Sequence, residues 1–216
     1  MLSATTLSAK SVQTLQNRGL SEQQMNDFSV LLDKANEQLD KQSSAKQVMT
    51  NMSAAELKLL QKATSLANPI SIQSLSNEGA RNLLAQPDGK GLVDNNNDGI
   101  VEIGEGRTIR FPPVNAPASV HKAWEKASAN MSEGDKLTLQ LHMHHLVYGS
   151  QIDGLSTKQA LPPEEQWSKS GRQELLEYAR SALEFSVSRE GWNHMNSVKR
   201  DLFNRLEEMF ANMNVA

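Results

Sequence analysis

The residues best suited to chemistry lie in one short polar stretch, DNNNDGIVEIGE, at positions 94–105. Asp94, Asn96 and Asp98 alternate along the chain, so a tightly turning backbone can direct all three side chains toward one point. Gly99 follows them, where a sharp turn would strain a residue that carries a Cβ. Calcium is a hard cation that takes about six to eight oxygen ligands. The spacing therefore predicts a calcium site.

The stretch resembles the calcium-binding loop of the EF-hand family, because it matches the pattern D-x-[DN]-x-[DN]-G-x5-E at every constrained position. The resemblance implies that Ile100 binds the ion through its backbone carbonyl and that Glu102 binds directly or through water. It also implies that Glu105 closes the coordination shell with both carboxylate oxygens. The complete predicted ligand set is Asp94, Asn96, Asp98, Ile100, Glu102 and Glu105.

The segments beside the loop differ from those of an EF-hand, which has one helix before the loop and another after it. Upstream, residues 87–91 (PDGKG) are of the types that end a helix. Downstream, residues 107–111 (RTIRF) run into Pro112-Pro113, a pattern typical of extended chain. We therefore expect a structural ion or a simple one-site response, and not a sensor that opens on binding.

The sequence contains no second loop that matches this pattern. The segment around Asp153-Gly154 lacks the alternating ligands and the closing glutamate of the first loop. The residue types predict a turn. The loop at 94–105 is therefore expected to act without a second loop beside it.

Three of the five histidines lie together in residues 141–146 (LHMHHL). On a helix, His142 and His145 share a face, and with a third group from elsewhere they could ligate a transition metal. The alternative is a structural role in packing at a helix surface. The role of His144 stays open between these alternatives.

The rest of the sequence predicts amphipathic helices. Capping boxes at 21–24, 53–56 and 170–173 each precede a run of apolar residues at helical spacing. A short helix is expected over residues 77–86. In the first long helix the expected core positions are Met25, Phe28, Leu32, Ala35 and Leu39.

Further helices are expected in the C-terminal half. One begins at Asn115-Ala116-Pro117 and another is capped by Ser132. Their expected apolar faces are Val120, Trp124 and Ala127, and then Leu137, Leu141 and Tyr148. The last two helices are expected to pack through Leu175, Tyr178, Ala179, Ala182 and Phe185, and through Trp192, Met195, Leu202, Leu206, Met209 and Met213.

These elements predict a mainly α fold: helical bundles with one EF-hand-like loop and a short extended segment between two helical halves. The predicted divisions are a Gln- and Ser-rich helical region at 1–86, the loop and connector at 87–114, and a helical domain at 115–216. Phe28 alone among the aromatic residues precedes the loop, so the C-terminal half is expected to contain the better-packed core.

Composition excludes several classes of function. The net charge of −3 is mild and has no basic stripe, so nucleic-acid binding is not expected. The absence of cysteine excludes disulfides and thiol catalysis. No apolar run is long enough for a membrane span or for a secretory signal. We expect a cytoplasmic protein, with export without a cleaved signal peptide as the alternative.

Three functional hypotheses follow. The first is a calcium-binding interaction or regulatory module of bacterial type, not an enzyme, in which calcium stabilises the junction between the helical halves. A partner protein or a second copy would bind through the N-terminal helices. The second is a structural or exported assembly protein of the flagellar or type III kind. The third and weakest is a metal-dependent hydrolase that uses His142 and His145.

Overall fold

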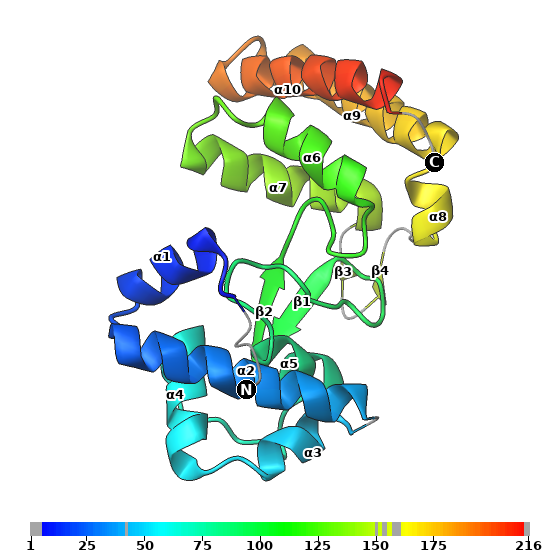
Figure 1. Ribbon diagram of the computed structural model, residues 1–216. Helices are drawn as coiled ribbons and strands as arrows, with labels where there is room; N and C mark the ends of the chain where they lie inside the picture. Colours follow the sequence, from blue (N-terminus) through cyan, green and yellow to red (C-terminus); the bar gives the residue numbers. More distant parts are fainter. Residues whose placement is uncertain (1–5, 42, 150, 153–154, 157–160, 214–216) are drawn as a thin grey trace. The chain divides into compact units, whose positions relative to one another are not determined.

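The structure is a computed structural model that describes residues 6–41, 43–149, 151–152, 155–156 and 161–213 (Figure 1). It is mainly helical, which confirms the predicted fold class. The chain divides into two compact units. The first unit comprises Met1–Asn95 and Val101–Thr108, and the second comprises Asn96–Ile100 and Ile109–Ala216.

Each helix described in the first unit begins at a serine cap. Its helices are α1 (Ala9–Asn17), α2 (Glu22–Asp40), α3 (Ala45–Thr50), α4 (Ala54–Thr64) and α5 (Asn77–Leu83). Ser21 and Ser53 form the predicted capping boxes, with Gln24 and Glu56 as their respective partners. A third capping box, formed by Ser44, starts α3. Each box pairs backbone N–H groups that the first helical turn leaves without an acceptor.

The core of the first unit is aliphatic around a single aromatic residue. Phe28 on α2 is fully buried. It packs with the predicted positions on the same helix, which include Leu32, and with Met49 of α3, Leu60 of α4 and Leu83 of α5. Among the predicted positions, Leu39 is only partly buried. The helical spacing therefore identified the buried face of α2 correctly.

Extended chain follows the acidic loop at β2 (Gly106–Ile109), as predicted. β2 forms a two-stranded sheet with β1 (Ile100–Ile103), which lies within the loop, and α5 ends at Leu83, before residues 87–91. The sheet is fastened to α5 at Gly79, whose carbonyl accepts a hydrogen bond of 3.0 Å from the amide of Gly104. A Cβ on Gly79 would lie 2.2 Å from the carbonyl oxygen of Gly104, so this approach requires glycine.

The second unit places four helices of 10 to 22 residues against one another. Its elements are α6 (Ala118–Ala127), α7 (Glu133–Tyr148), β3 (Gln151–Ile152), β4 (Leu155–Ser156), α8 (Pro163–Gln166), α9 (Lys169–Glu190) and α10 (His194–Ala211). Figure 1 shows α9 and α10 side by side, and α6 and α7 both pack against this pair. Strands β3 and β4 pair antiparallel. The predicted turn at Asp153-Gly154 lies outside the described residues.

The core of the second unit contains most of the aromatic residues. Phe111 meets Trp124 edge-on, with ring centroids 4.9 Å apart and an interplanar angle of 76°. Edge-to-face contacts of this kind add attraction beyond the apolar area that they bury. The other buried aromatic residues of this core are Tyr148, Trp167, Phe203 and Phe210.

The prediction for the buried face of α7 is wrong at two positions. Ser132 caps the helix as expected. However, Leu137 and Leu141 are 69% and 44% exposed, whereas Leu139 and Met143 are fully buried. Apolar residues occur on several faces of this helix, so helical spacing alone did not identify the side that packs.

Predictions for α9 and for the start of α10 also need correction. The cap of α9 is Ser168 and not Ser170, because the Ser168 hydroxyl accepts the amide of Gly171 at 3.0 Å. Tyr178 and Phe185 were expected in the core but are 54% and 64% exposed. Trp192 precedes α10 and is exposed as well.

Among the residues described, no helix is both long enough and apolar enough to cross a lipid bilayer.

Candidate metal centre

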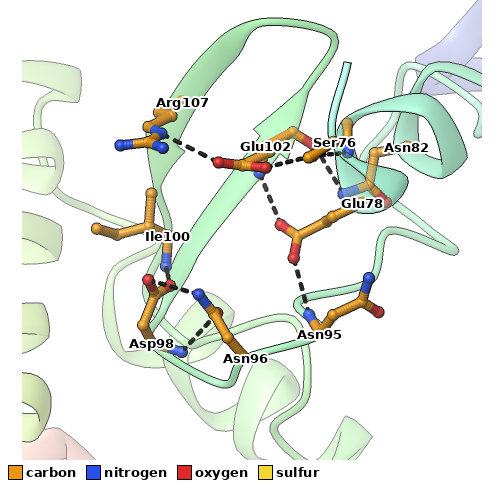
Figure 2. A network of polar contacts seen from close by, with 10 residues as sticks. Ser76, Glu78, Asn82, Asn95, Asn96, Asp98, Ile100, Glu102 and Arg107 are labelled. Carbon is orange, nitrogen blue, oxygen red and sulfur yellow. Dashed lines mark hydrogen bonds and ion pairs between the residues drawn. The ribbon is translucent and has the colours of Figure 1, made fainter. Parts of the chain in front are cut away.

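Residues 96–100 form a compact turn that the side chains of Asn96 and Asp98 hold together (Figure 2). The side-chain amide of Asn96 donates a hydrogen bond to Asp98 Oδ2 at 3.0 Å, and Asp98 Oδ1 accepts one from the backbone amide of Ile100 at 2.8 Å. The backbone has positive φ at Asn97 (55°) and at Gly99 (75°). The expected sharp turn at Gly99 is therefore confirmed.

Gly99 is required for steric reasons as well. A Cβ there would lie 2.3 Å from a ring carbon of Tyr148 and 2.8 Å from Nδ1 of His144. The two rings are 5.0 Å apart between centroids. The turn at residues 96–100 therefore rests directly on one face of α7, and no larger residue fits at its apex.

His144 is the histidine of the cluster that the turn covers. It is 5% exposed, and its Nδ1 has no hydrogen-bond partner within the described residues. Burial lowers the pKa of His144, the nearby His145 lowers it further, and Asp98 acts in the opposite direction. The lowered pKa therefore favours the neutral form of the imidazole.

The ligands predicted in the first unit are engaged with protein partners. Asp94 is 4% exposed. The carboxylate of Glu102 accepts a hydrogen bond from the Ser76 hydroxyl and pairs with Arg107 Nε at 3.1 Å. Glu105 lies in the turn between β1 and β2, where it accepts a hydrogen bond from the hydroxyl of Ser74.

The organising residue on this side is Glu78 of α5, which the sequence reasoning missed. Its carboxylate is buried and accepts the backbone amides of Asn95 and Glu102, both at 2.8 Å (Figure 2). Asn82 lies one turn further along α5. Its side-chain nitrogen donates to the carbonyls of Val93 and Glu102, and its side-chain oxygen accepts a hydrogen bond from the amide of Val93, each at 2.8 Å. Two side chains of one short helix therefore hold the backbone at both ends of the acidic loop.

No sequence signal identifies this role. Glu78 is in the first turn of a helix that Ser76 caps, where an acidic residue is favourable for the helix itself. The residues that Glu78 holds are 17 and 24 positions away along the chain.

The structure brings together only part of the predicted ligand set. It joins Asn96 to Asp98, whereas Glu102 and Glu105 are hydrogen-bonded to Ser76 and Ser74. Across the described ranges, no group of three or more His, Cys, Asp or Glu side chains is arranged to hold a metal ion. Calcium binding therefore stays a prediction.

The histidine cluster has a different environment at each ring. His142 is half-buried and its ring is nearly parallel to that of Phe203, with centroids 6.4 Å apart. Burial lowers its pKa to about 4, and Lys199 and His145 contribute. His145 is exposed, and the described residues supply no third ligand for a metal beside the pair.

Comparisons with protein-family models, with curated proteins and with solved structures found no match to this chain.

The role of the Glu78 carboxylate as acceptor of the Asn95 and Glu102 backbone amides can be tested with Glu78→Gln. This variant keeps the size of the side chain but leaves one oxygen to accept both hydrogen bonds. Hydrogen bonds to charged groups contribute about 1.5 to 3 kcal/mol each. We expect amide hydrogen exchange at Asn95 and Glu102 to accelerate roughly 10- to 100-fold. Glu37→Gln, on α2 of the same unit, is the matched control. Unchanged exchange at both amides would show that the carboxylate is dispensable.

The environment of His142 predicts acid sensitivity of the second unit. Its pKa is about 4 when folded and about 6.5 when unfolded, so the unfolded state binds the extra proton first as pH falls. The free energy of unfolding is therefore unaffected by His142 above about pH 6.5, and protonation of His142 in the unfolded state lowers it by about 2 to 3 kcal/mol toward pH 4. Because Trp124, Trp167 and Trp192 all lie in this unit, tryptophan fluorescence during denaturant unfolding measures its stability.

The variant His142→Gln isolates this contribution, because it removes the titrating group while the carboxylates still titrate as in the wild type. We expect its free energy of unfolding to fall less between pH 7 and pH 4 (roughly the pKa interval of His142) than that of the wild type. Identical pH dependence in the two proteins would mean that His142 does not contribute.

Proposed function

We propose that the chain is a calcium-binding interaction or regulatory protein, not a catalyst, in which the loop at residues 94–105 binds the ion. One observation carries the proposal. The turn at 96–100 has the positive φ at Gly99 that the motif requires, and it holds the carboxylate of Asp98 against the side chain of Asn96. The sixth position of such a loop needs this turn so that successive ligands face the ion.

The charge of the loop supports the same proposal. Four carboxylates fall within twelve residues: Asp94, Asp98, Glu102 and Glu105. Arg107 is paired with Glu102. Like charges this close along the chain disfavour one another, and a divalent cation removes that repulsion.

Binding would require exchanges of hydrogen bonds at two ligands. Glu102 and Glu105 would release the hydroxyls of Ser76 and Ser74, which are neutral donors. Glu102 would also exchange its ion pair with the exposed Arg107 for the ion. Glu78 holds backbone amides, so its bonds can persist while the side chains exchange partners. An ion would thus complete a loop whose backbone is already fastened to α5.

The position of the loop in the chain gives the ion its structural role in this proposal. The chain passes from one unit to the other at residues 95–96, 100–101 and 108–109, and the first two of these crossings lie inside the loop. An ion held by the loop would restrict the backbone at these two crossings. Calcium would therefore stabilise the segment through which the units are connected.

Calcium titration of the full chain by calorimetry tests the proposal. We expect one site, and thermal stabilisation by about 2.7 kcal/mol when free calcium is 100 times Kd. Asp98→Asn keeps an oxygen for the amide of Ile100 but removes the charge, so affinity should fall by about tenfold or more.

The charge-matched control is Asp201→Asn on α10, outside the loop. It should bind calcium as the wild type does. Equal affinity of the wild type and Asp98→Asn, or the same melting temperature with calcium and with chelator, would remove the loop as the calcium site.

The interaction part of the proposal has support from exposed aromatic residues. Tyr178 and Phe185 lie seven positions apart on α9, so they share one face, and both are more than half exposed. Exposed apolar patches commonly mark interaction sites. Binding of a partner through the N-terminal helices stays a prediction. In the described part of the first unit, Val30 is the one large apolar residue that is exposed.

These exposed rings also favour the second candidate, an assembly protein that associates with copies of itself, in the cytoplasm or after export. We expect light scattering to show a mass that rises with concentration, and Tyr178→Ser with Phe185→Ser to abolish the rise. Val30→Ser is the control in the first unit. A concentration-independent monomer would exclude self-association and leave the calcium proposal intact.

A further inference from the structure

A cavity in the second unit lies between α9 and α10. Its volume is about 310 Å³, at the low end of the range of small-molecule sites. Arg172, Leu176 and Phe210 are the buried residues that line it, and the exposed residues include Lys169 and Gln173. The lining therefore combines an apolar wall with a buried cation.

Arg172 is the unusual member of this lining. Its side chain is 4% exposed, and its guanidinium carbon lies 5.7 Å from the centroid of the Phe210 ring. Nη1 donates to the carbonyl of Trp167, but Nε is buried and has no acceptor within the part of the chain that the structure describes. Buried charges in proteins are ordinarily paired, so a buried guanidinium without a carboxylate partner calls for an anion.

The described residues do not supply that anion. No carboxylate among them pairs with Arg172. Two acidic residues line the cavity, Glu177 and Glu207, and Glu207 is paired with Arg180 at 2.7 Å. Burial lowers the pKa of Arg172, yet an arginine remains charged at neutral pH. Arg172 thus lines the cavity as a buried positive charge that no carboxylate among the described residues neutralises.

We propose that this cavity binds a small monocarboxylate with an apolar chain, whose carboxylate pairs with the guanidinium of Arg172. A guanidinium edge matches the two oxygens of a carboxylate in a bidentate pair. Leu176 and Phe210 supply the apolar surface for the chain. A multiply charged anion is disfavoured, because Glu177 and Glu207 also line the cavity.

The test uses the full chain and three ligands: hexanoate, hexan-1-ol and inorganic phosphate. Binding is followed by ¹H–¹⁵N NMR, which also observes the Nε–H of Arg172. Hexanoate should bind saturably and shift this signal and the amide of Leu176. Hexan-1-ol and phosphate should bind about tenfold more weakly or worse, because each lacks one half of the recognition.

Arg172→Gln should weaken hexanoate binding by about tenfold or more. The matched control is Arg189→Gln, since Arg189 is on the same helix, outside the cavity lining. The proposal is overturned if hexanoate does not saturate, if hexan-1-ol or phosphate binds as tightly, or if Arg172→Gln binds hexanoate unchanged. If Arg172→Gln does not fold, the comparison of the three ligands on the wild type still decides.

Discussion

The two backbone amides held by Glu78 are the constraint on which the acidic loop depends. Burial fixes only part of this segment, at residues such as Val101, so its backbone donors need acceptors of their own. Glu78 provides both carboxylate oxygens, to Asn95 and to Glu102. Charge-assisted bonds of this kind are among the strongest in proteins, and they make the burial of the carboxylate tolerable. α5 benefits equally, because a helix of seven residues is marginal without tertiary contacts.

Much of the helical fold followed from the sequence because the relevant forces are local. A serine hydroxyl caps the amide three residues later, so Ser21, Ser53 and Ser132 marked true helix starts. The run at 87–91 and the prolines after residue 111 excluded helices beside the loop for equally local reasons. These interactions span three or four residues and can be identified from spacing alone.

Features that depend on distant neighbours could not be predicted in this way. The face of α7 that packs is decided by the other helices of its unit, so Leu137 was placed in the core although it is exposed. The same holds for Phe185 on α9. At the candidate site, the roles of Glu78 and Asn82 arise from contacts across 11 to 24 positions. Arg172 likewise differs from an ordinary surface arginine only through burial.

The polar composition of the turn at residues 96–100 has a structural cause as well as a proposed chemical one. Side-chain oxygens of Glu78, Asn96 and Asp98 accept backbone amides in or beside the loop, so some oxygen-bearing residues are needed whether or not an ion is present. A carboxylate oxygen has more than one lone pair, however, and an amide donor occupies only one of them. Asp98 can thus hold the turn and still offer an oxygen to a cation. The same turn that explains part of the motif without calcium leaves the chemistry of calcium binding in place.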